Sequence, residues 1–428
     1  MMLRRDTIAL TALLALLTAF GPMATDIYVP SMPSIGRLLG ASTSDVQLTL
    51  SSYLLGYALG QVVYGPVSDR FGRRPALLLA LALFCAASLA CAAAPTIEML
   101  IAARGLQALG AAGVVLLPRA IVRDLHAGAQ AGRELSRIGA IMSFAPVIAP
   151  LIGGVVQETF GWRANFIVIV GVGIAAAAMV WRSLPETLQR PAAGPVRLAA
   201  TLRDCRVLLG DRMFVAHAGI LGCSYAVVFA WISGSPFVLQ NLYGLSPFAF
   251  SIAYAVACGG ALAGGSIAAS LAMRIGLDRT MALGAVCLAA GGLAMMVCLA
   301  LGWPPVPSLV LSMVVCHAGN MLATPQAVAG ALTPFPHCAG TASSLLGLVQ
   351  QISAALVGTL VGLALGRSAW PLAIAIATMG CVSVALWAAS RRARADAMHE
   401  PPAVQAAAHD IGLLSRRLAS AKPGAVVK

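Results

Sequence analysis

Two charged side chains lie inside long apolar stretches of this 428-residue sequence and are the first candidates for chemistry. Asp26 is the one acid well inside the run at 8–29, and Arg104 lies about seven residues into the run at 97–118. Gln107 follows three residues later, on the same helix face. Charges are costly in hydrocarbon, so those retained there are functional candidates by default. Burial favours the protonated form of a carboxyl group, which suits a group that takes up and releases protons. We therefore predict that Asp26, Arg104 and Gln107 form a proton-coupling or substrate site.

Both charged residues also have simpler interpretations. Asp26 could face water at a helix end if the first run stops near Val29. Arg104 could extend its side chain to the outer interface. The first run could also extend through Pro30 and Pro33 to about Leu39, with Pro22, Pro30 and Pro33 bending it. The functional interpretation predicts that Asp26 and Arg104 are coupled, so that protonation of the carboxyl group changes what the guanidinium contacts.

A dense pattern of glycine, acid and arginine separates the runs at 47–66 and 75–95. Its defining positions are Gly65, Asp69, Arg70, Gly72, Arg73 and Arg74. We expect Gly65 and Gly72 to permit a tight reversal between two helices. Asp69 can contact a helix N-terminus or a neighbouring Arg. An ordinary positively charged turn is the alternative, but the order of the residues favours a specific contact.

Small residues recur at every fourth position of the run at 136–157, and prolines interrupt it. The pattern consists of Ala145, Pro146, Ala149, Pro150, Gly153 and Gly154. The small face lets another backbone approach closely, and the prolines are expected to bend the helix. From spacing alone, generic helix packing is the better explanation of the pattern.

These segments together resemble the major facilitator superfamily of transporters. Residues 65–75 match the loop signature G-x-x-x-D-R-x-G-R-R at every defining position, and residues 104–110 are similar to the fourth-helix motif R-x-x-Q-G-x-G, with Ala108 replacing a Gly. Residues 149–154 are similar to the G-P-x-x-G-G motif of proton-driven exporters, with Ala149 replacing the first Gly. Residues 25–33 and 231–237 resemble the bicyclomycin/chloramphenicol-resistance (Bcr/CflA) family of twelve-span drug/proton antiporters.

The resemblance covers about residues 5–390 and implies a function. It implies proton-driven efflux of small amphipathic compounds, such as antibiotics, from a bacterial inner membrane. Asp26 would exchange protons and recognise cationic drugs. The residues around Gly153 would form a gate against leakage, and the segment from Gly65 to Arg74 would form a cytoplasmic latch.

Composition identifies the elements that must position these residues. The chain is 59% hydrophobic and 10% charged, whereas soluble proteins carry about 25% charged residues. Its mean hydropathy of +0.88 fits an all-α membrane protein. The apolar runs lie near 8–29, 47–66, 75–95, 97–118, 136–157, 163–184, 213–238, 248–271, 280–302, 307–331, 340–366 and 369–390.

The distribution of arginine predicts the topology. Alternate loops are rich in Arg, as is the long polar link at 186–212, and cytoplasmic loops hold such charges. Both termini are therefore expected in the cytoplasm, with twelve transmembrane helices in two six-helix halves at 1–185 and 213–390. Residues 391–428 are predicted to form a disordered basic tail.

Aromatic and polar groups within the runs are candidates for lining a central cavity. They are Tyr28, Tyr53, Tyr57, Tyr225, Phe229, Trp231, Tyr254, His317, Asn320 and Gln350. Aromatic residues in membrane spans more often face lipid or the interface. For His317, we expect a hydrogen bond to another helix rather than a proton relay.

Several function classes are disfavoured. The only lysines are Lys422 and Lys428, so the body of the chain holds no ATPase P-loop. H-E-x-x-H, G-x-S-x-G and C-x-x-C are absent, so we predict no enzyme, cofactor or metal site. The net charge of +13 sits mainly in loops and the tail, so we predict no nucleic-acid partner. We expect a monomer that binds protons, a small molecule and the lipid bilayer. The rivals are a metabolite transporter of the same fold, with Arg104 as an anion anchor, and a non-transporting sensor or membrane enzyme.

Overall fold

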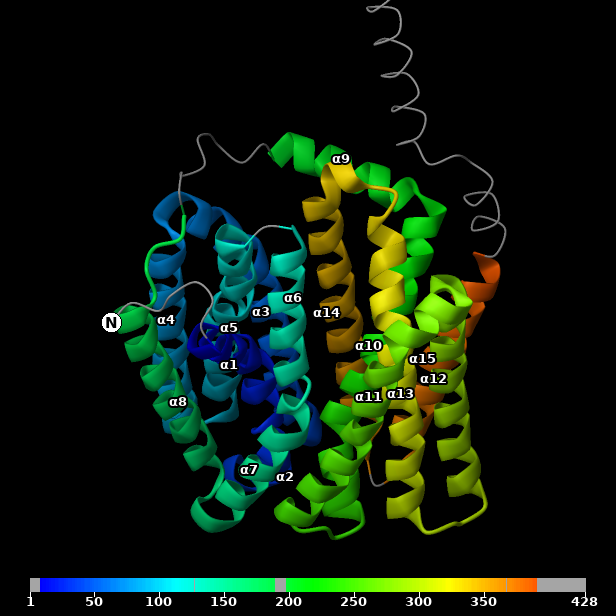
Figure 1. Cartoon of the computed structure of the whole chain (residues 1–428). Coiled ribbons are helices and arrows are strands. Elements are labelled where there is room, and N and C mark those ends of the chain that lie inside the picture. Colours follow the sequence, from blue (N-terminus) through cyan, green and yellow to red (C-terminus); the bar gives the residue numbers. More distant parts are fainter. Residues whose placement is uncertain (1–7, 127, 189–197, 367, 391–428) are drawn as a thin grey trace, which may run out of the picture.

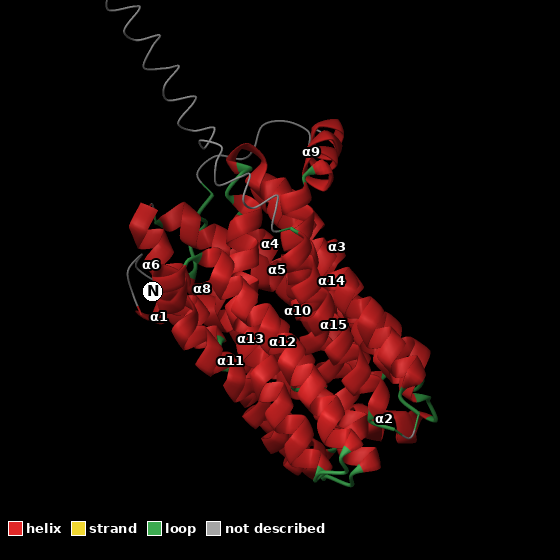
Figure 2. Cartoon of the chain, turned by 90° about the vertical axis from the view of Figure 1, so that its right-hand side faces the viewer, coloured by secondary structure: helices red, strands yellow, loops and turns green. Residues whose placement is uncertain are grey.

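The computed structural model describes residues 8–126, 128–188, 198–366 and 368–390. All regular elements in these ranges are helices, which confirms the all-α prediction (Figure 2). The predicted disordered tail at 391–428 lies outside the described residues.

The first group of helices precedes the polar link. It comprises α1 (Ile8–Asp26), the short 3₁₀ helix η1 (Val29–Ser31), α2 (Met32–Leu39), α3 (Thr43–Phe71), α4 (Arg73–Ala93), α5 (Ile97–Leu125), α6 (Gly128–Met142), α7 (Ala145–Phe160) and α8 (Trp162–Ser183). Within this group α5 packs against α1, α3 and α4, and α8 packs against α4. We call it the first bundle.

The second group begins within the link. It comprises α9 (Leu198–Gly210), α10 (Arg212–Pro236), the π-helical segment η2 (Phe237–Leu242), α11 (Pro247–Ile275), α12 (Leu277–Ala300), α13 (Pro305–Leu332), the 3₁₀ helix η3 (Pro336–Cys338), α14 (Ala339–Ala364) and α15 (Trp370–Ala389). Helices α10 to α15 pack on one another, and we call them the second bundle. Helix α9 lies across one end of the molecule, where it contacts α10 and α14 (Figure 1).

Within the described residues, eleven helical segments are long and apolar enough to cross a membrane. The segments Ile8–Leu39 and Gln130–Phe160 each combine two α-helices separated by a break. Helix α3 is 29 residues long but is not among the eleven. Its buried face carries polar side chains such as Gln47 and Ser51, which lower its apolar character.

Helices of the two bundles meet at the end opposite α9. There α7 packs against α11, and α3 packs against α14 (Figure 1). The buried Gln47 Nε2 donates to the carbonyl of Ser233 over 2.8 Å, and the hydroxyls of Ser51 and Thr359 are 3.0 Å apart.

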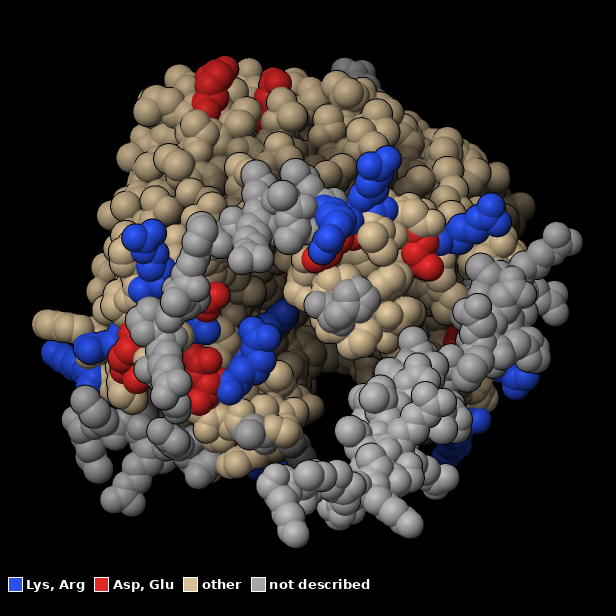
Figure 3. All heavy atoms as spheres, turned by 90° about the horizontal axis from the view of Figure 1, so that it is seen from above, with Lys and Arg blue, Asp and Glu red and all other residues tan. Residues whose placement is uncertain are grey.

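Two further hydrogen bonds join the bundles at this end. Gln240 Nε2 donates to the Pro30 carbonyl over 3.1 Å, and the Phe248 N–H donates to Glu158 Oε1 over 3.0 Å. Seen from the α9 end, the surface is hollowed between the bundles (Figure 3). The structure is therefore closed at the end opposite α9 and hollowed at the α9 end.

Candidate functional site

Asp26 lies inside the first span and is shielded from solvent. It is the last residue of α1, but the span continues to Leu39 and the side chain is only 3% exposed. Its Oδ1 accepts long hydrogen bonds from the hydroxyls of Thr25 (3.4 Å) and Tyr254 (3.5 Å). The alternative of an acid facing water at a helix end is therefore wrong. Because Tyr254 belongs to α11, the carboxyl group lies where the two bundles meet.

Arg104 is fully buried in α5, so the alternative of a side chain reaching the outer interface is wrong. Its Nη1 donates to the carbonyl of Ala24 (3.0 Å) and to Gln107 Oε1 (2.6 Å). The guanidinium carbon lies 4.5 Å from the ring centroid of Tyr28 and 4.4 Å from that of Tyr53. Such cation–π contacts stabilise a desolvated cation. Nε and Nη2 have no hydrogen-bond partner among the described residues.

Gln107 lies on the same face of α5 as Arg104, as the spacing of the two residues predicted, and accepts a hydrogen bond from the guanidinium. Its Nε2 donates to the Ser88 hydroxyl on α4 over 2.8 Å, which leaves the amide oxygen facing Arg104. The hydrogen-bonded group around Arg104 thus comes from α1, α4 and α5. No ion pair joins Asp26 to Arg104 in the described structure; the guanidinium instead contacts Ala24, two residues before the acid. Their coupling stays a prediction.

The small residues of the fifth run lie between the two bundles. An added Cβ at Gly153 would overlap the backbone carbonyl of Ile27, directly after Asp26. An added Cβ at Gly154 would overlap the side chain of Ser251 on α11. The two neighbouring glycines therefore let α7 approach the end of α1 on one side and α11 on the other. The third small residue of the motif, Ala149, is also buried.

The main break in this run does not lie at the prolines, where a bend was expected. The break lies at residues 143–144, between α6 and α7. Pro146 sits in the first turn of α7, where proline is tolerated because its missing N–H would have no partner in the helix. Of the two prolines, only Pro150 lies beyond the first turn of α7.

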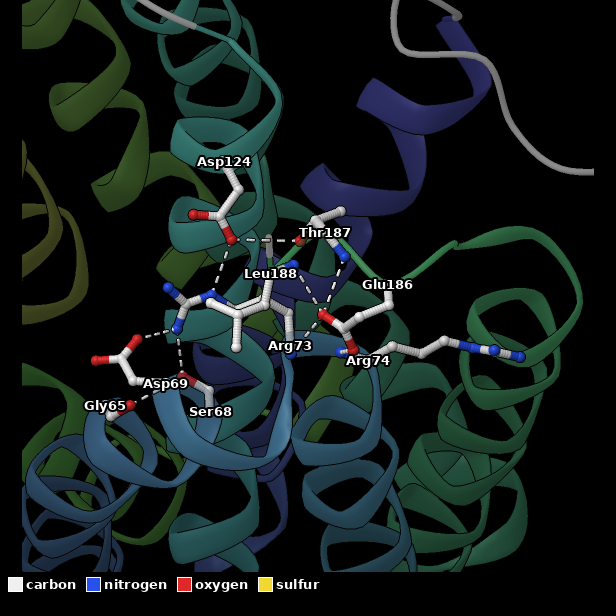
Figure 4. Close-up of polar contacts among 9 residues, drawn as sticks. All are labelled: Gly65, Ser68, Asp69, Arg73, Arg74, Asp124, Glu186, Thr187 and Leu188. Atoms are coloured by element: carbon white, nitrogen blue, oxygen red, sulfur yellow. Dashed lines mark hydrogen bonds and ion pairs between the residues drawn. The ribbon is translucent and has the colours of Figure 1, made fainter. Parts of the chain in front are cut away.

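The loop signature forms a hydrogen-bonded hub around Arg73 (Figure 4). Nη1 contacts Asp69 Oδ1 at 2.5 Å and the Ser68 hydroxyl at 2.7 Å, while Nε contacts Asp124 Oδ2 of α5 at 2.9 Å. Gly72, with a φ of 102°, provides the break between α3 and α4. The turn role expected of Gly65 is wrong, because Gly65 lies inside α3.

Glu186, at the start of the polar link, has a role that the sequence did not predict. Its carboxylate accepts the N–H groups of Arg73 (2.9 Å) and Arg74 (3.1 Å), which are the free donors at the start of α4. It also accepts the N–H groups of Thr187 and Leu188, both at 2.9 Å. The chain after α8 is thereby fixed to the turn (Figure 4). The other two arginines of the signature make separate contacts. Arg74 donates to the Trp181 carbonyl, and the guanidinium carbon of Arg70 lies 5.6 Å from the centroid of the Phe71 ring.

The candidate cavity residues fall into separate groups. Tyr28 and Tyr53 enclose Arg104, Tyr57 stacks on Tyr53 at 6.4 Å, and Tyr225 packs against Phe229 at 6.1 Å. Trp231 is fully buried.

The two polar candidates on α13 bond within their own helix. The Nδ1 of His317 pairs with the Met313 carbonyl (3.1 Å), and Asn320 accepts from Thr324 (3.0 Å). The bond expected from His317 to another helix is therefore wrong.

Comparison with known proteins identifies the class. The family model of the Major Facilitator Superfamily matches residues 14–358, so the chain belongs to this superfamily. The D-xylose-proton symporter structure aligns with a TM-score of 0.72 at 17% identity, covering 88% of this chain and 95% of that one. The major facilitator fold is thereby confirmed. The protein is a multi-pass protein of a bacterial inner membrane, and it is a transporter rather than an enzyme.

Curated relatives narrow the family. An uncharacterised MFS-type transporter, YdgK of Bacillus subtilis, is 34% identical, covering 84% of this chain and 90% of its own length. The chloramphenicol resistance protein of Pseudomonas aeruginosa is 30% identical over 93% of this chain and 96% of its own. A bicyclomycin resistance protein homolog of Haemophilus influenzae is 29% identical over 90% of this chain and 96% of its own length. The resemblance inferred from the motifs is confirmed.

Proposed function

We propose that the protein exports small amphipathic compounds, including antibiotics of the chloramphenicol or bicyclomycin class, in exchange for protons. Relatives named for resistance to these drugs align along most of its length. The observation that carries the proposal is the position of Asp26. A buried carboxyl group inside a span, where the two bundles meet, can bind a proton or a cationic substrate in turn.

The proposal assigns a role to each part of the molecule. The halves at 1–185 and 213–390 rock about the link at 186–212, with twelve spans and both termini in the cytoplasm. Under this orientation the α9 end faces the cytoplasm, and the described state is closed to the outside. Asp26 is the proton acceptor and Arg104 is its electrostatic partner. The hub around Arg73 is the cytoplasmic latch, and the transporter works as a monomer.

A metabolite transporter is the second candidate, and one observation favours it. Two guanidinium nitrogens of the fully buried Arg104, Nε and Nη2, have no hydrogen-bond partner within the described part of the chain. A buried donor without an acceptor is costly, and a substrate carboxylate would satisfy it. An amino acid or an organic acid would then replace the drug as cargo.

Substrate-evoked proton movement tests both candidates. The purified chain is reconstituted in vesicles that enclose a pH-sensitive dye. Chloramphenicol and cationic dyes are added in one series, and amino acids and organic acids in another. Drug export predicts a pH change with the first series alone, whereas metabolite transport predicts it with the second. A chain that responds to neither, while binding either, would be a sensor rather than a transporter.

A further inference from the structure

Three contacts fix the outer half of α11 against the first bundle. At the helix start, the Phe248 N–H donates to Glu158 of α7 over 3.0 Å. Next, Ser251 packs against the bare backbone of Gly154. One turn deeper, the Tyr254 hydroxyl donates to Asp26 Oδ1 over 3.5 Å. The deepest of these contacts is the only one that involves the proposed proton acceptor.

The Tyr254 hydrogen bond depends on the charge of Asp26. A carboxylate accepts a hydrogen bond about twice as strongly as a neutral group does. Tyr254 is 1% exposed and Asp26 is 3% exposed, so little water competes for the contact. A proton on Asp26 removes the charge, and a cationic substrate shields it. Either event weakens the attraction between α11 and α1.

We propose that the hydrogen bond from the Tyr254 hydroxyl to Asp26 keeps the two bundles together at the end opposite α9 whenever the Asp26 carboxylate binds neither a proton nor a cation. We call this positioning contact the lock. Loading Asp26 with a proton or a cation releases the contact and allows this end to open. The proposal rests on the proposed role of Asp26. Such a lock suits exchange transport, because a carrier that cannot reorient while empty does not dissipate the proton gradient.

Other ionisable groups lie near Asp26, so the experiment must distinguish their effects from that of the Tyr254 hydrogen bond. Tyr53 of α3, Tyr225 of α10 and Cys258 of α11 lie within range of its charge. Arg104 of α5 reaches the same helix end through the Ala24 carbonyl. Among these groups, Tyr254 alone donates a hydrogen bond from the second bundle to Asp26. Helix α7 faces this region with Gly153, which has no titratable group.

The lock can be tested without a known substrate, using protons as the only ligand. The ten native cysteines are first replaced. Spin labels are then attached at Phe160, the last residue of α7, and at Trp303, between α12 and α13. Both positions are largely exposed, and they lie on different bundles. Distances between the labels are measured in the full-length reconstituted chain at about pH 9 and about pH 5. The parent chain should be closed at high pH, and its ratio of open to closed molecules should rise about tenfold at low pH.

Tyr254→Phe removes the hydroxyl and keeps the ring, which packs on Phe250 at 5.9 Å. Its open fraction at high pH should match that of the parent chain at low pH. Tyr243→Phe, on a tyrosine outside this contact, should behave like the parent chain. If Tyr254→Phe keeps the parent's pH response, or if the parent has none, the lock is refuted.

Asp26→Asn separates this proposal from the proposed function. The amide imitates the protonated acid, so the variant should be open at both pH values, and adding Tyr254→Phe should change nothing further. A full pH response in Asp26→Asn would refute Asp26 as the proton site. A flat response in Asp26→Asn with a normal response in Tyr254→Phe would refute the lock alone.

Discussion

Replacing Gly154 with alanine should open the end opposite α9 without unfolding the protein. The added Cβ would lie 2.9 Å from the Pro247 carbonyl and 3.0 Å from the Ser251 Cβ, in addition to overlapping the Ser251 hydroxyl. Overpacking of this kind costs about 1–3 kcal/mol. The strain exists only while α7 and α11 are in contact. The closed state alone is penalised, so the ratio of open to closed molecules should rise by about 5- to 150-fold.

Gly171→Ala is a matched control for Gly154→Ala. Gly171 lies inside α8, and an added Cβ would meet nothing within 4 Å. Both substitutions gain about 1 kcal/mol of helix propensity, so the difference between them reports the contact with α11. The distance between spin labels at Phe160 and Trp303 should lengthen in Gly154→Ala and stay unchanged in Gly171→Ala. Identical distance distributions in the two variants would refute the reasoning.

Three further substitutions test other parts of the structure. Gly153→Val places a branched side chain against the Ile27 backbone, so transport should be lost while the protein still inserts; normal efflux would contradict the gate. Glu186→Gln keeps the shape of the cap at α4 but removes its charge, and should lower the unfolding free energy by about 1 kcal/mol. A smaller loss is expected for Glu98→Gln, which removes an exposed charge from the first turn of α5. Arg104→Ala removes the contacts to Ala24 and Gln107 and should abolish substrate-driven proton flux; flux equal to wild type would exclude Arg104 from coupling.

The local features of the fold could be predicted from the sequence. Hydropathy located the long apolar helices, and the pattern around Gly72 located the turn between α3 and α4. Hydropathy did not locate the break at residues 143–144 or helix α9 within the link. The spacing of Arg104 and Gln107 correctly placed both side chains on one face of α5. These features depend on residues near one another in the chain, where helical periodicity determines which side chains meet.

Contacts between distant segments could not be predicted in the same way. Nothing in the spacing relates Tyr254 to Asp26, 228 positions away, or Glu186 to Arg73, 113 positions away. The role given to Gly65 was wrong because α3 continues for six residues beyond it, to Phe71. For His317, the helix's own Met313 carbonyl supplied the partner that was expected from a neighbouring helix.

The central claim is that Asp26 carries the exchanged proton. It is tested most directly by measuring substrate-evoked pH change in vesicles containing Asp26→Asn, beside wild type and Asp45→Asn. Asp45 is a matched control because its carboxylate caps the start of α3 in a partly exposed position. We predict a pH change with wild type and with Asp45→Asn, and none with Asp26→Asn. A wild-type response from Asp26→Asn would contradict the account and place proton coupling elsewhere in the molecule.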